Sequence, residues 1–527
     1  MQMNKLSLKA LAALAAGALA ANVQGLTTPT VDYTTYVEKP QPQGVLTTLV
    51  KGPDTRGFSW ITDTSVTESK VWLLKGAYTA ADDAKFASEG TLYTGECKNT
   101  PWPTTVNSHL VKVYGLTEAG TYSYRLGGGD KFAYGQFEVK SAPADNAFTV
   151  LNLNDAQTRH FKLLYVWENT VAQAKGLTDG NVDFILYGGD YLDVSPDASN
   201  LSGKRLLEWG IAADCSVPYF PKTPWVMASG NHDYQVFAYT MPVDYAYTNN
   251  AILAGTPIVG CTSFDYGKVH FAVLPCLNTG SWNSYYAETL AWLEQDLQKA
   301  KAAKDAKTID WIVISDHFSP YTTGDHCVSG DALAERLAPI CAKYEVDLFL
   351  QAHDHTYSKS LPYRWDGPGL TTSNDRTSED VKKAVNLNPK TTVVGGETYD
   401  LDPNGTYYVS CATAGERNNE APTWADVNGS NSYANKRKYK LITGKVNVNS
   451  TCVYEGVDYG RKIGDDASHD HRASMFGVLK FKGDTMSYDF YIVNMDGTTA
   501  PVLYDTLKVK KTLAPPAFDA GTMVFVR

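Results

Sequence analysis

FILYGGDYLDV, residues 184–194, is the stretch that decides the fold. Its first four residues are apolar or aromatic and predict a buried strand, which breaks off into Gly188, Gly189 and Asp190. A second acid, Asp193, follows three positions later. Because ligands of α/β proteins bind beyond the carboxyl ends of the strands, the stretch predicts an α/β fold with Asp190 at a functional edge.

The same pattern, an apolar run that ends in polar residues, recurs at four other places. It is found in FTVLNLND, PWVMASGNHD, WIVISDH and VDLFLQAHDH. The polar residues at these ends are Asp155, Asn231, His232, Asp233, His317, His353 and His355. Together with Asp190 they are expected to lie at one edge of a sheet.

Any one of these residues alone would carry little weight, because an Asp after a strand is usually a turn or helix-capping residue. Their joint occurrence favours a site, since the chain has only 10 histidines and four of them stand at these strand ends. Five histidines without such a setting are interpreted as structural: His109, His160, His270, His469 and His471.

Carboxylates, an amide and imidazoles together suit metal ions such as Zn, Mn or Fe. No cysteine belongs to the set, which disfavours a closed structural zinc site. One ion cannot use so many ligands, whereas two ions about 3.5–4 Å apart can share a carboxylate and bind a phosphate between them. Asp190 is the natural bridge, and the cofactor prediction is two metal ions.

In this order the five motifs resemble those of the calcineurin-like metallophosphoesterase superfamily. The motifs are Asp155, GD at 189–190, GNHD at 230–233, His317, and AHDH at 352–355. The β-rich segment before them and the ending FGVLKF…YDFYIVNMDG resemble purple acid phosphatases. The resemblance implies a four-layer α/β/β/α sandwich preceded by an all-β immunoglobulin- or fibronectin-III-like sandwich.

The resemblance also implies a role for each residue. Asp155 and His355 would bind the first metal, and Asp190 would bridge. The second metal would be bound by Asn231, His317 and His353. His232, positioned by Asp233, would contact the phosphate or protonate the leaving oxygen. His326 stands where related phosphatases have another substrate-contacting His; its alternative is a loop residue beside Cys327.

The first-metal ligands depart from both family patterns. Purple acid phosphatases have GDxxY, whose Tyr binds ferric iron and gives the colour, but here Asp193 stands at that position. Other members have D-x-H, where this chain has Gln157. Gln157 is a candidate weak ligand through its amide oxygen; the alternative, that Gln157 or Asp193 caps the next helix, stays open. The most similar subgroup is the bacterial type that lacks the tyrosine.

The rest of the chain predicts the domain order. Short β-rich runs between Val45 and Lys140 predict a β-sandwich at 38–141, in which Gly127-Gly128-Gly129-Asp130 is a hairpin turn. The catalytic domain is expected at 146–495, and residues 496–527 are interpreted as a C-terminal tail.

Within the catalytic domain, leucines at helical spacing predict helices at 285–303 and 331–344. Two polar stretches rich in Gly, Pro, Thr or Asn predict surface insertions at about 361–404 and 418–445.

Composition and the N-terminal sequence limit the expected location and partners of the protein. The chain has 527 residues and a net charge of −10, without long runs of Lys or Arg, so nucleic acid is not an expected partner. Residues 1–22 have the pattern of a secretory signal peptide, which predicts a secreted or periplasmic protein. No later stretch is long and apolar enough to predict a membrane span. Eight cysteines permit up to four disulfides.

The predicted function is the hydrolysis of small phosphomonoesters by a hydroxide that bridges two metal ions. A phosphodiesterase or nucleotidase of the same superfamily is the enzymatic alternative. A secreted binding protein with a degenerate catalytic domain is the alternative of another class, and the incomplete first-metal ligand set motivates it. The oligomeric state does not follow from the sequence.

Overall fold

The computed structural model describes most of the chain. The described residues are 31–32, 35–100, 106–141, 144–157, 164–191, 205–216, 218–233, 251–253, 256–258, 261–275, 287–321, 327–355, 357–364, 389–415, 453–454, 457–458, 474–493 and 500–513. The predicted signal peptide at 1–22, Asp193, His326 and the predicted insertion at 418–445 lie outside these residues.

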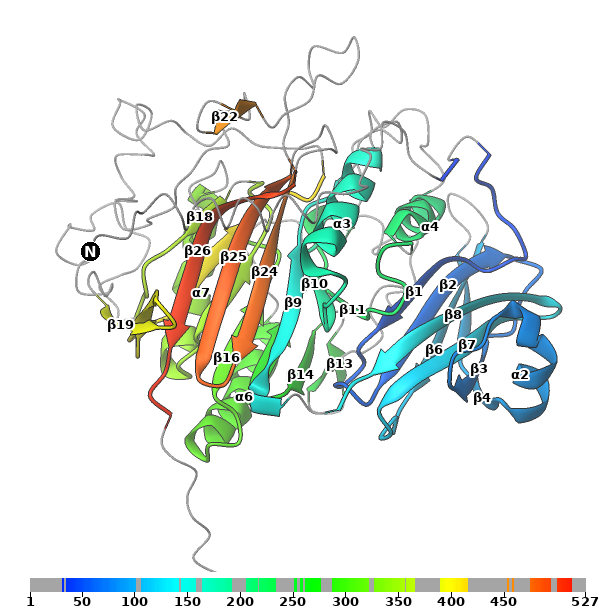
Figure 1. Cartoon of the computed structure of the whole chain (residues 1–527), viewed down its shortest axis with the longest axis horizontal. Helices are drawn as coiled ribbons and strands as arrows, with labels where there is room; N and C mark the ends of the chain where they lie inside the picture. Colours follow the sequence, from blue (N-terminus) through cyan, green and yellow to red (C-terminus); the bar gives the residue numbers. More distant parts are fainter. Residues whose placement is uncertain are drawn as a thin grey trace, which may run out of the picture.

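A 12-stranded sheet runs through the whole molecule (Figure 1). Its centre is three adjacent parallel strands: β9 (Phe148–Leu153), β10 (Phe184–Tyr187) and β11 (Trp225–Met227). On one side follow β24 (Ser474–Lys482), β25 (Thr485–Val493), β26 (Val502–Lys510), β20 (Glu397–Leu401) and β19 (Lys390–Val394). On the other side follow β1 (Gln43–Thr48), β2 (Arg56–Asp63), β6 (Val106–Val113) and β5 (Glu96–Thr100).

A second sheet of six strands faces the centre of the first. Its order is β14 (Thr262–Tyr266), β15 (Val269–Val273), β16 (Trp311–Ser315), β17 (Leu348–Gln351), β21 (Tyr407–Cys411) and β18 (Tyr357–Lys359). Strands β15, β16, β17 and β21 are parallel to one another. Two short hairpins complete the described strands: β12 (Ala251–Leu253) with β13 (Thr256–Ile258), and β22 (Val453–Tyr454) with β23 (Val457–Asp458).

The residues of β10 explain why both faces of the central strands are covered. Side chains alternate between the two faces of a strand. Phe184 and Leu186 join the core between the two sheets, whereas Ile185 and Tyr187 join the core under the helices. A parallel strand buried on both faces needs a continuous apolar run, and FILY is one.

Helices cover the outer face of each sheet. The core outside the large sheet contains α3 (Leu164–Thr178) and α4 (Arg205–Ser216). The core outside the six-stranded sheet contains α6 (Ala287–Asp305) and α7 (Cys327–Lys343). The predicted helices at 285–303 and 331–344 are confirmed by α6 and α7, and the predicted α/β class is confirmed by these four layers.

The N-terminal segment is almost entirely β. The sheet β4 (Thr91–Thr94), β3 (Lys70–Lys75), β7 (Gly120–Gly128) and β8 (Lys131–Val139) packs on β2 and β6 around a separate core. A short helical stretch, η1 (Ala80–Asp82) and α2 (Asp83–Glu89), joins β3 to β4. The predicted turn is confirmed, because Gly128 pairs with Lys131 across the β7–β8 hairpin.

The sandwich is not separated from the catalytic half by a break in the sheet. β1 pairs in parallel with β11 at Thr48 and Trp225, so the large sheet continues from one part into the other. The immunoglobulin- or fibronectin-III-like character of the sandwich stays a prediction.

The structure corrects the predicted C-terminal tail in part, because Val502–Lys510 forms β26. Tyr504, Leu507 and Val509 enter the core between the sheets. An irregularity in the pairing with β25, between Phe490 and Tyr491, shifts the alternation within β26. The apolar residues therefore do not follow a single period of two, which is why the pattern did not predict a strand.

Part of the predicted insertion at 361–404 is the hairpin β19–β20. Val394 pairs with Glu397, which leaves Gly395 and Gly396 as a two-residue turn with φ of 59° and 88°. Positive φ at both positions is the favoured hairpin geometry. Most side chains of this hairpin are exposed or half-buried, so it lacks the buried pattern by which strands are predicted.

Five cysteines of the described part of the chain are free thiols: Cys97, Cys215, Cys261, Cys341 and Cys411. With five of its eight cysteines free, the chain does not form the four disulfides that the cysteine count permits. Among the described helices, none combines the length and hydropathy that crossing a membrane requires.

His270, interpreted above as structural, lies between two carboxylates. Its Nδ1 is 2.7 Å from Asp265 and its Nε2 is 2.8 Å from Asp296. Burial alone would lower the pKa of His270, but the two carboxylates outweigh burial and raise the pKa to about 9.

We expect this group to make stability fall at alkaline pH. A pKa raised from about 6.5 to about 9 contributes about 3 kcal/mol to the free energy of unfolding. That contribution is complete below pH 6.5 and is lost as the pH rises through 9. Melting temperatures of the wild type and His270→Gln between pH 6 and 9.5 check this: the difference should narrow as pH rises, and a constant difference would contradict it.

Candidate metal centre

Five strand ends converge on one cluster, but they belong to two sheets. The large sheet contributes Asp155 after β9, Asp190 after β10, and residues 231–233 after β11. The six-stranded sheet contributes His317 after β16, and His353 and His355 after β17. The prediction of a single sheet edge is therefore wrong. Because the local pattern is the same in both sheets, only the tertiary fold separates them.

Asp190 sits at a sharply turned strand end. It is fully buried, and its φ of 55° is a left-handed conformation that non-glycine residues rarely adopt. Gly189 before it has a φ of 100°, and a side chain there would collide with the Gly230 backbone and the His317 ring. Such strain persists only where the surroundings hold it.

The Asp233 carboxylate stabilises this turn through hydrogen bonds to the backbone. It accepts backbone N–H bonds from Asp190 and Gly230 at 2.8 Å each and from Tyr191 at 3.0 Å. The backbone N–H of His232 in turn donates to Asp190 Oδ1 at 2.7 Å. These bonds position Asp190 against the next strand end; a catalytic role for Asp233 stays a prediction.

Asp155, Asp190 and His355 form a first group of potential ligands. Each offers one atom, and these atoms lie within 4.8 Å of one another. His355 Nε2 is 3.4 Å from Asp155 Oδ1. The backbone N–H of His353 donates to the Asp155 carboxylate at 3.1 and 3.2 Å, which fixes the orientation of this carboxylate.

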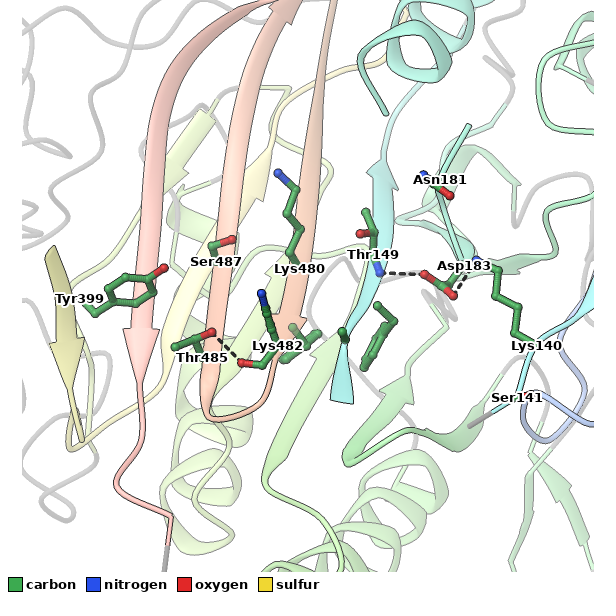
Figure 2. Close-up of a pocket in the computed structure, with 13 residues that line it drawn as sticks. Lys140, Ser141, Thr149, Asn181, Asp183, Tyr399, Lys480, Lys482, Thr485 and Ser487 are labelled. Carbon is green, nitrogen blue, oxygen red and sulfur yellow. Dashed lines mark hydrogen bonds and ion pairs between the residues drawn. The ribbon is translucent and has the colours of Figure 1, made fainter. Parts of the chain in front are cut away.

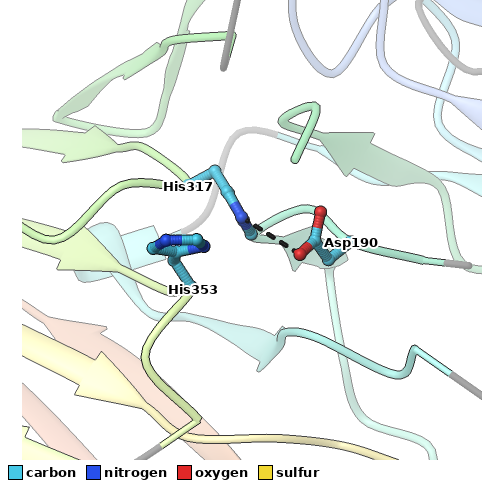
Figure 3. A group of neighbouring side chains, drawn as sticks. All are labelled: Asp190, His317 and His353. Carbon is cyan, nitrogen blue, oxygen red and sulfur yellow. Dashed lines mark ion pairs between the residues drawn. The ribbon is translucent and has the colours of Figure 1, made fainter. Parts of the chain in front are cut away.

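Asp190, His317 and His353 form a second group within the same 4.8 Å limit, and Figure 3 shows their side chains converging. His317 Nε2 lies 3.3 Å from Asp190 Oδ2 and 2.9 Å from Asn231 Oδ1. Asp190 is thus common to both groups, as expected of a carboxylate that bridges two ions.

The tautomer of His317 is set by the backbone. Its Nδ1 lies 2.9 Å from the carbonyl oxygen of Gly188, which can only accept, so Nδ1 carries a hydrogen. Nε2 then faces the oxygens of Asp190 and Asn231. A proton or a metal ion on Nε2 satisfies this arrangement, and metal-binding histidines are commonly oriented by such a second hydrogen bond.

The electrostatics of the cluster also indicate a metal site. Burial raises the pKa of Asp155. Burial would also raise the pKa of Asp190, but His317 and His232 outweigh burial and hold it well below its usual value. Burial would lower the pKa of His317, but Asp190 and Asp155 raise it to about 10. Since metal ions displace protons from such groups, buried carboxylates and imidazoles of this kind fit a pair of cations.

Four further residues complete the account of the predicted site. The Gln157 side-chain amide donates to Asp190 Oδ2, so Gln157 faces the bridging position; ligation and positioning both stay open. His232 is the more accessible group, with 20% of its side chain exposed and Nε2 3.9 Å from Asp190 Oδ2. Asp193 and His326 lie outside the described residues.

Tyr191 points away from the cluster. Its buried ring packs against Trp209, Tyr187 and Trp167 at centroid distances of 4.7, 5.2 and 5.6 Å, in the core under the helices. Tyr191 and Asp190 are successive residues, and their side chains face opposite sides. The Tyr191 phenol is not a metal ligand here.

Residues 148–357 match the family model described as calcineurin-like phosphoesterase. The range contains every potential ligand named above. The chain carries a calcineurin-like phosphoesterase domain.

Proteins similar to this chain include a purple acid phosphatase. Purple acid phosphatase 22 of Arabidopsis thaliana is 26% identical over 334 residues, which cover 61% of this chain and 67% of that protein. An uncharacterized protein of Mycobacterium tuberculosis is 29% identical over 184 residues, which cover 32% of this chain and 33% of that protein. The predicted resemblance to purple acid phosphatases is confirmed.

Solved structures agree on the fold. A purple acid phosphatase from yellow lupin (Lupinus luteus) seeds superposes with a TM-score of 0.54 at 15% identity, over 89% of this chain and 74% of that chain. The structure of PhoD also gives a TM-score of 0.54, at 11% identity, over 91% of this chain and 92% of that chain. The phosphoesterase family implies a metal-dependent phosphoester hydrolase with a binuclear centre.

A cavity of about 590 Å³ lies beside strands β9, β24 and β25 (Figure 2). It is lined by Thr149 near the start of β9, whereas Asp155 follows the end of that strand. Two of its lysines, Lys140 and Lys480, already pair with carboxylates at 2.8 and 3.1 Å. The cavity is therefore not part of the metal centre.

One segment of the phosphoesterase site had no counterpart among the predicted residues. Residues 412–415, ATAG, follow β21 and contact the turn that carries Asp155. They lack charged or imidazole side chains, so a search for ligand types passes over them. The available signal was their place in the sequence. They follow the apolar run YYVSC, which makes this a sixth strand end.

Proposed function

We propose that the protein is an exported phosphatase that uses two metal ions to hydrolyse small phosphomonoesters. The observation that supports this most directly is the membership of Asp190 in both ligand groups. A shared carboxylate holds two ions at the separation that suits a phosphate between them. The predicted signal peptide supports export.

The residues have distinct proposed roles. Asp155 and His355 hold the first ion, Asn231, His317 and His353 hold the second, and Asp190 bridges. When bound, the ions supply an activated water and neutralise charge on the phosphate.

His232 is proposed as the residue that meets the substrate. Its backbone N–H is tied to Asp190, while its ring is partly exposed beside the same carboxylate. From there the imidazolium can donate a hydrogen bond to a phosphate oxygen or a proton to the leaving alcohol. His326 is proposed as a second substrate contact on the family resemblance alone.

The choice of monoesters rests on the similarity to purple acid phosphatase 22. Hydrolysis of diesters or nucleotides is the enzymatic alternative. A binding protein with an inactive domain is less well supported, because the described ligand groups are both intact in their Asp and His members.

A panel of esters tests the proposal. We expect the purified protein, supplied with Zn, Mn or Fe(II), to hydrolyse p-nitrophenyl phosphate at least about tenfold more efficiently, in kcat/KM, than bis(p-nitrophenyl) phosphate. A preference for the diester would favour the phosphodiesterase alternative. Hydrolysis of neither compound by protein that has bound two ions per chain would favour the binding protein.

A further inference from the structure

We propose that Thr413 positions the carboxylate of Asp155 for the first metal ion, through a hydrogen bond between its hydroxyl and the Asp155 backbone. The inference rests on the proposed two-metal function and adds a positioning residue to that site.

The turn that carries Asp155 is strained. Asp155 has a φ of 48° and Gln157 a φ of 29°, and such left-handed conformations are unfavourable for non-glycine residues. The turn therefore needs bonds from outside. On one side it is held by the β10 strand end, where the Asp155 N–H donates to Gly189 O at 2.9 Å and the Gln157 N–H donates to Asp190 O at 3.1 Å.

The other side of the turn is held by residues 413–415. The Thr413 hydroxyl donates to the backbone carbonyl of Asp155 at 2.6 Å. The Ala414 N–H donates to Asn154 O at 2.7 Å, and Gly415 packs so closely on Ala156 that a side chain would collide with its carbonyl. Residues 413–415 thus contact three consecutive residues of the turn, Asn154, Asp155 and Ala156.

Thr413 itself is held firmly. It is completely buried, its hydroxyl accepts the Gly415 N–H at 3.1 Å, and its carbonyl accepts the Met475 N–H of β24 at 2.8 Å. Ala412 before it has a φ of 59°, another strained non-glycine residue. Backbone strain at Asp155 and at Ala412, next to Thr413, is expected where a functional geometry is imposed by its surroundings.

The effect on the metal follows from where Asp155 points. Its carboxylate is aligned by the His353 N–H and lies 3.4 Å from His355 Nε2 in the first ligand group. Removing the Thr413 hydroxyl leaves the Asp155 carbonyl without this donor and lets the strained turn relax, which moves the carboxylate. Loss of a group that orients a ligand typically weakens metal binding by about 10–100-fold.

The test compares Thr413→Val, Thr413→Ser and the matched control Thr406→Val. Thr406 is also buried, and its hydroxyl donates to a backbone carbonyl, that of Val346, at 2.7 Å, but away from the metal centre. Metal binding is measured by isothermal titration calorimetry with Zn or Mn, and folding by circular dichroism and thermal melting.

We expect Thr413→Val to weaken one of the two binding events by about 10–100-fold and to leave the other unchanged. Thr413→Ser should restore most of the affinity, and Thr406→Val should bind both ions like the wild type while losing comparable stability. In a His355→Gln background, which already lacks the first-metal imidazole, Thr413→Val should have little further effect.

Unchanged affinities for both ions in folded Thr413→Val would overturn the inference, as would an equal loss in Thr406→Val. If Thr413→Val does not fold, the metal affinity of Thr413→Ser, which keeps a hydroxyl, is compared with that of the wild type. A metal affinity of Thr413→Ser below that of Thr406→Val would count against the proposed role of the hydroxyl. The wild-type titration is read first: failure to bind two ions would count against the proposed function, whereas the difference between variants tests Thr413.

Discussion

Asp190→Asn is expected to reduce phosphatase turnover by on the order of 10³-fold while leaving the fold intact. Asp190 belongs to both ligand groups, so the loss of its negative charge weakens both ion positions at once. The amide keeps an oxygen that can accept the His232 N–H, and it leaves the backbone bonds to Asp233 in place. Catalysis should therefore suffer far more than stability.

The measurement is hydrolysis of p-nitrophenyl phosphate by wild type and variant at saturating metal, with circular dichroism and metal content determined on the same samples. Asp183→Asn is the matched control, because Asp183 immediately precedes the same strand, β10, at its opposite end. There it accepts the Thr149 N–H and pairs with Lys140 at 2.8 Å. Turnover of Asp190→Asn near that of Asp183→Asn would rule out a bridging role for Asp190.

The ligand types of the site were predictable from sequence because each follows the end of an apolar strand within four residues. Asp190 after FILY and His317 after WIVIS are local patterns, and local patterns survive without knowledge of the fold. The assignment of strands to sheets is not local. Nothing in the two patterns says that β10 and β16 lie in different sheets, and only the core shared by Phe184 and Phe271 reveals how the sheets face each other.

The residues that position the ligands were harder to predict. Gly188 acts through its carbonyl, which sets the tautomer of His317, and Thr413 acts through a hydroxyl on a segment more than 250 residues after Asp155. Neither side chain signals a metal site by its chemistry. Backbone groups and small hydroxyls become functional only through tertiary contacts, so the sequence of one chain does not distinguish them from ordinary loop residues.

Removal of metal should abolish activity without unfolding the protein. The cores on both sides of the central strands consist of apolar side chains and do not depend on the cluster, so dialysis against a chelator should leave the circular dichroism spectrum unchanged. The melting temperature should fall, because an ion present at 100 times its dissociation constant stabilises a protein by about 2.7 kcal/mol per site. Turnover should return when two ions per chain are restored.

Reconstitution also separates this protein from the purple acid phosphatases that it resembles. Colour there requires a tyrosine phenolate on ferric iron, but the Tyr191 ring is enclosed by Trp167, Tyr187 and Trp209 on the far side of the strand end. We expect iron-loaded protein to lack that visible band, and Zn or Mn to restore activity as well as Fe(II). Activity that survives complete metal removal would refute the metal-dependent mechanism. A visible band abolished by Tyr191→Phe would show that the phenol reaches the metal after all.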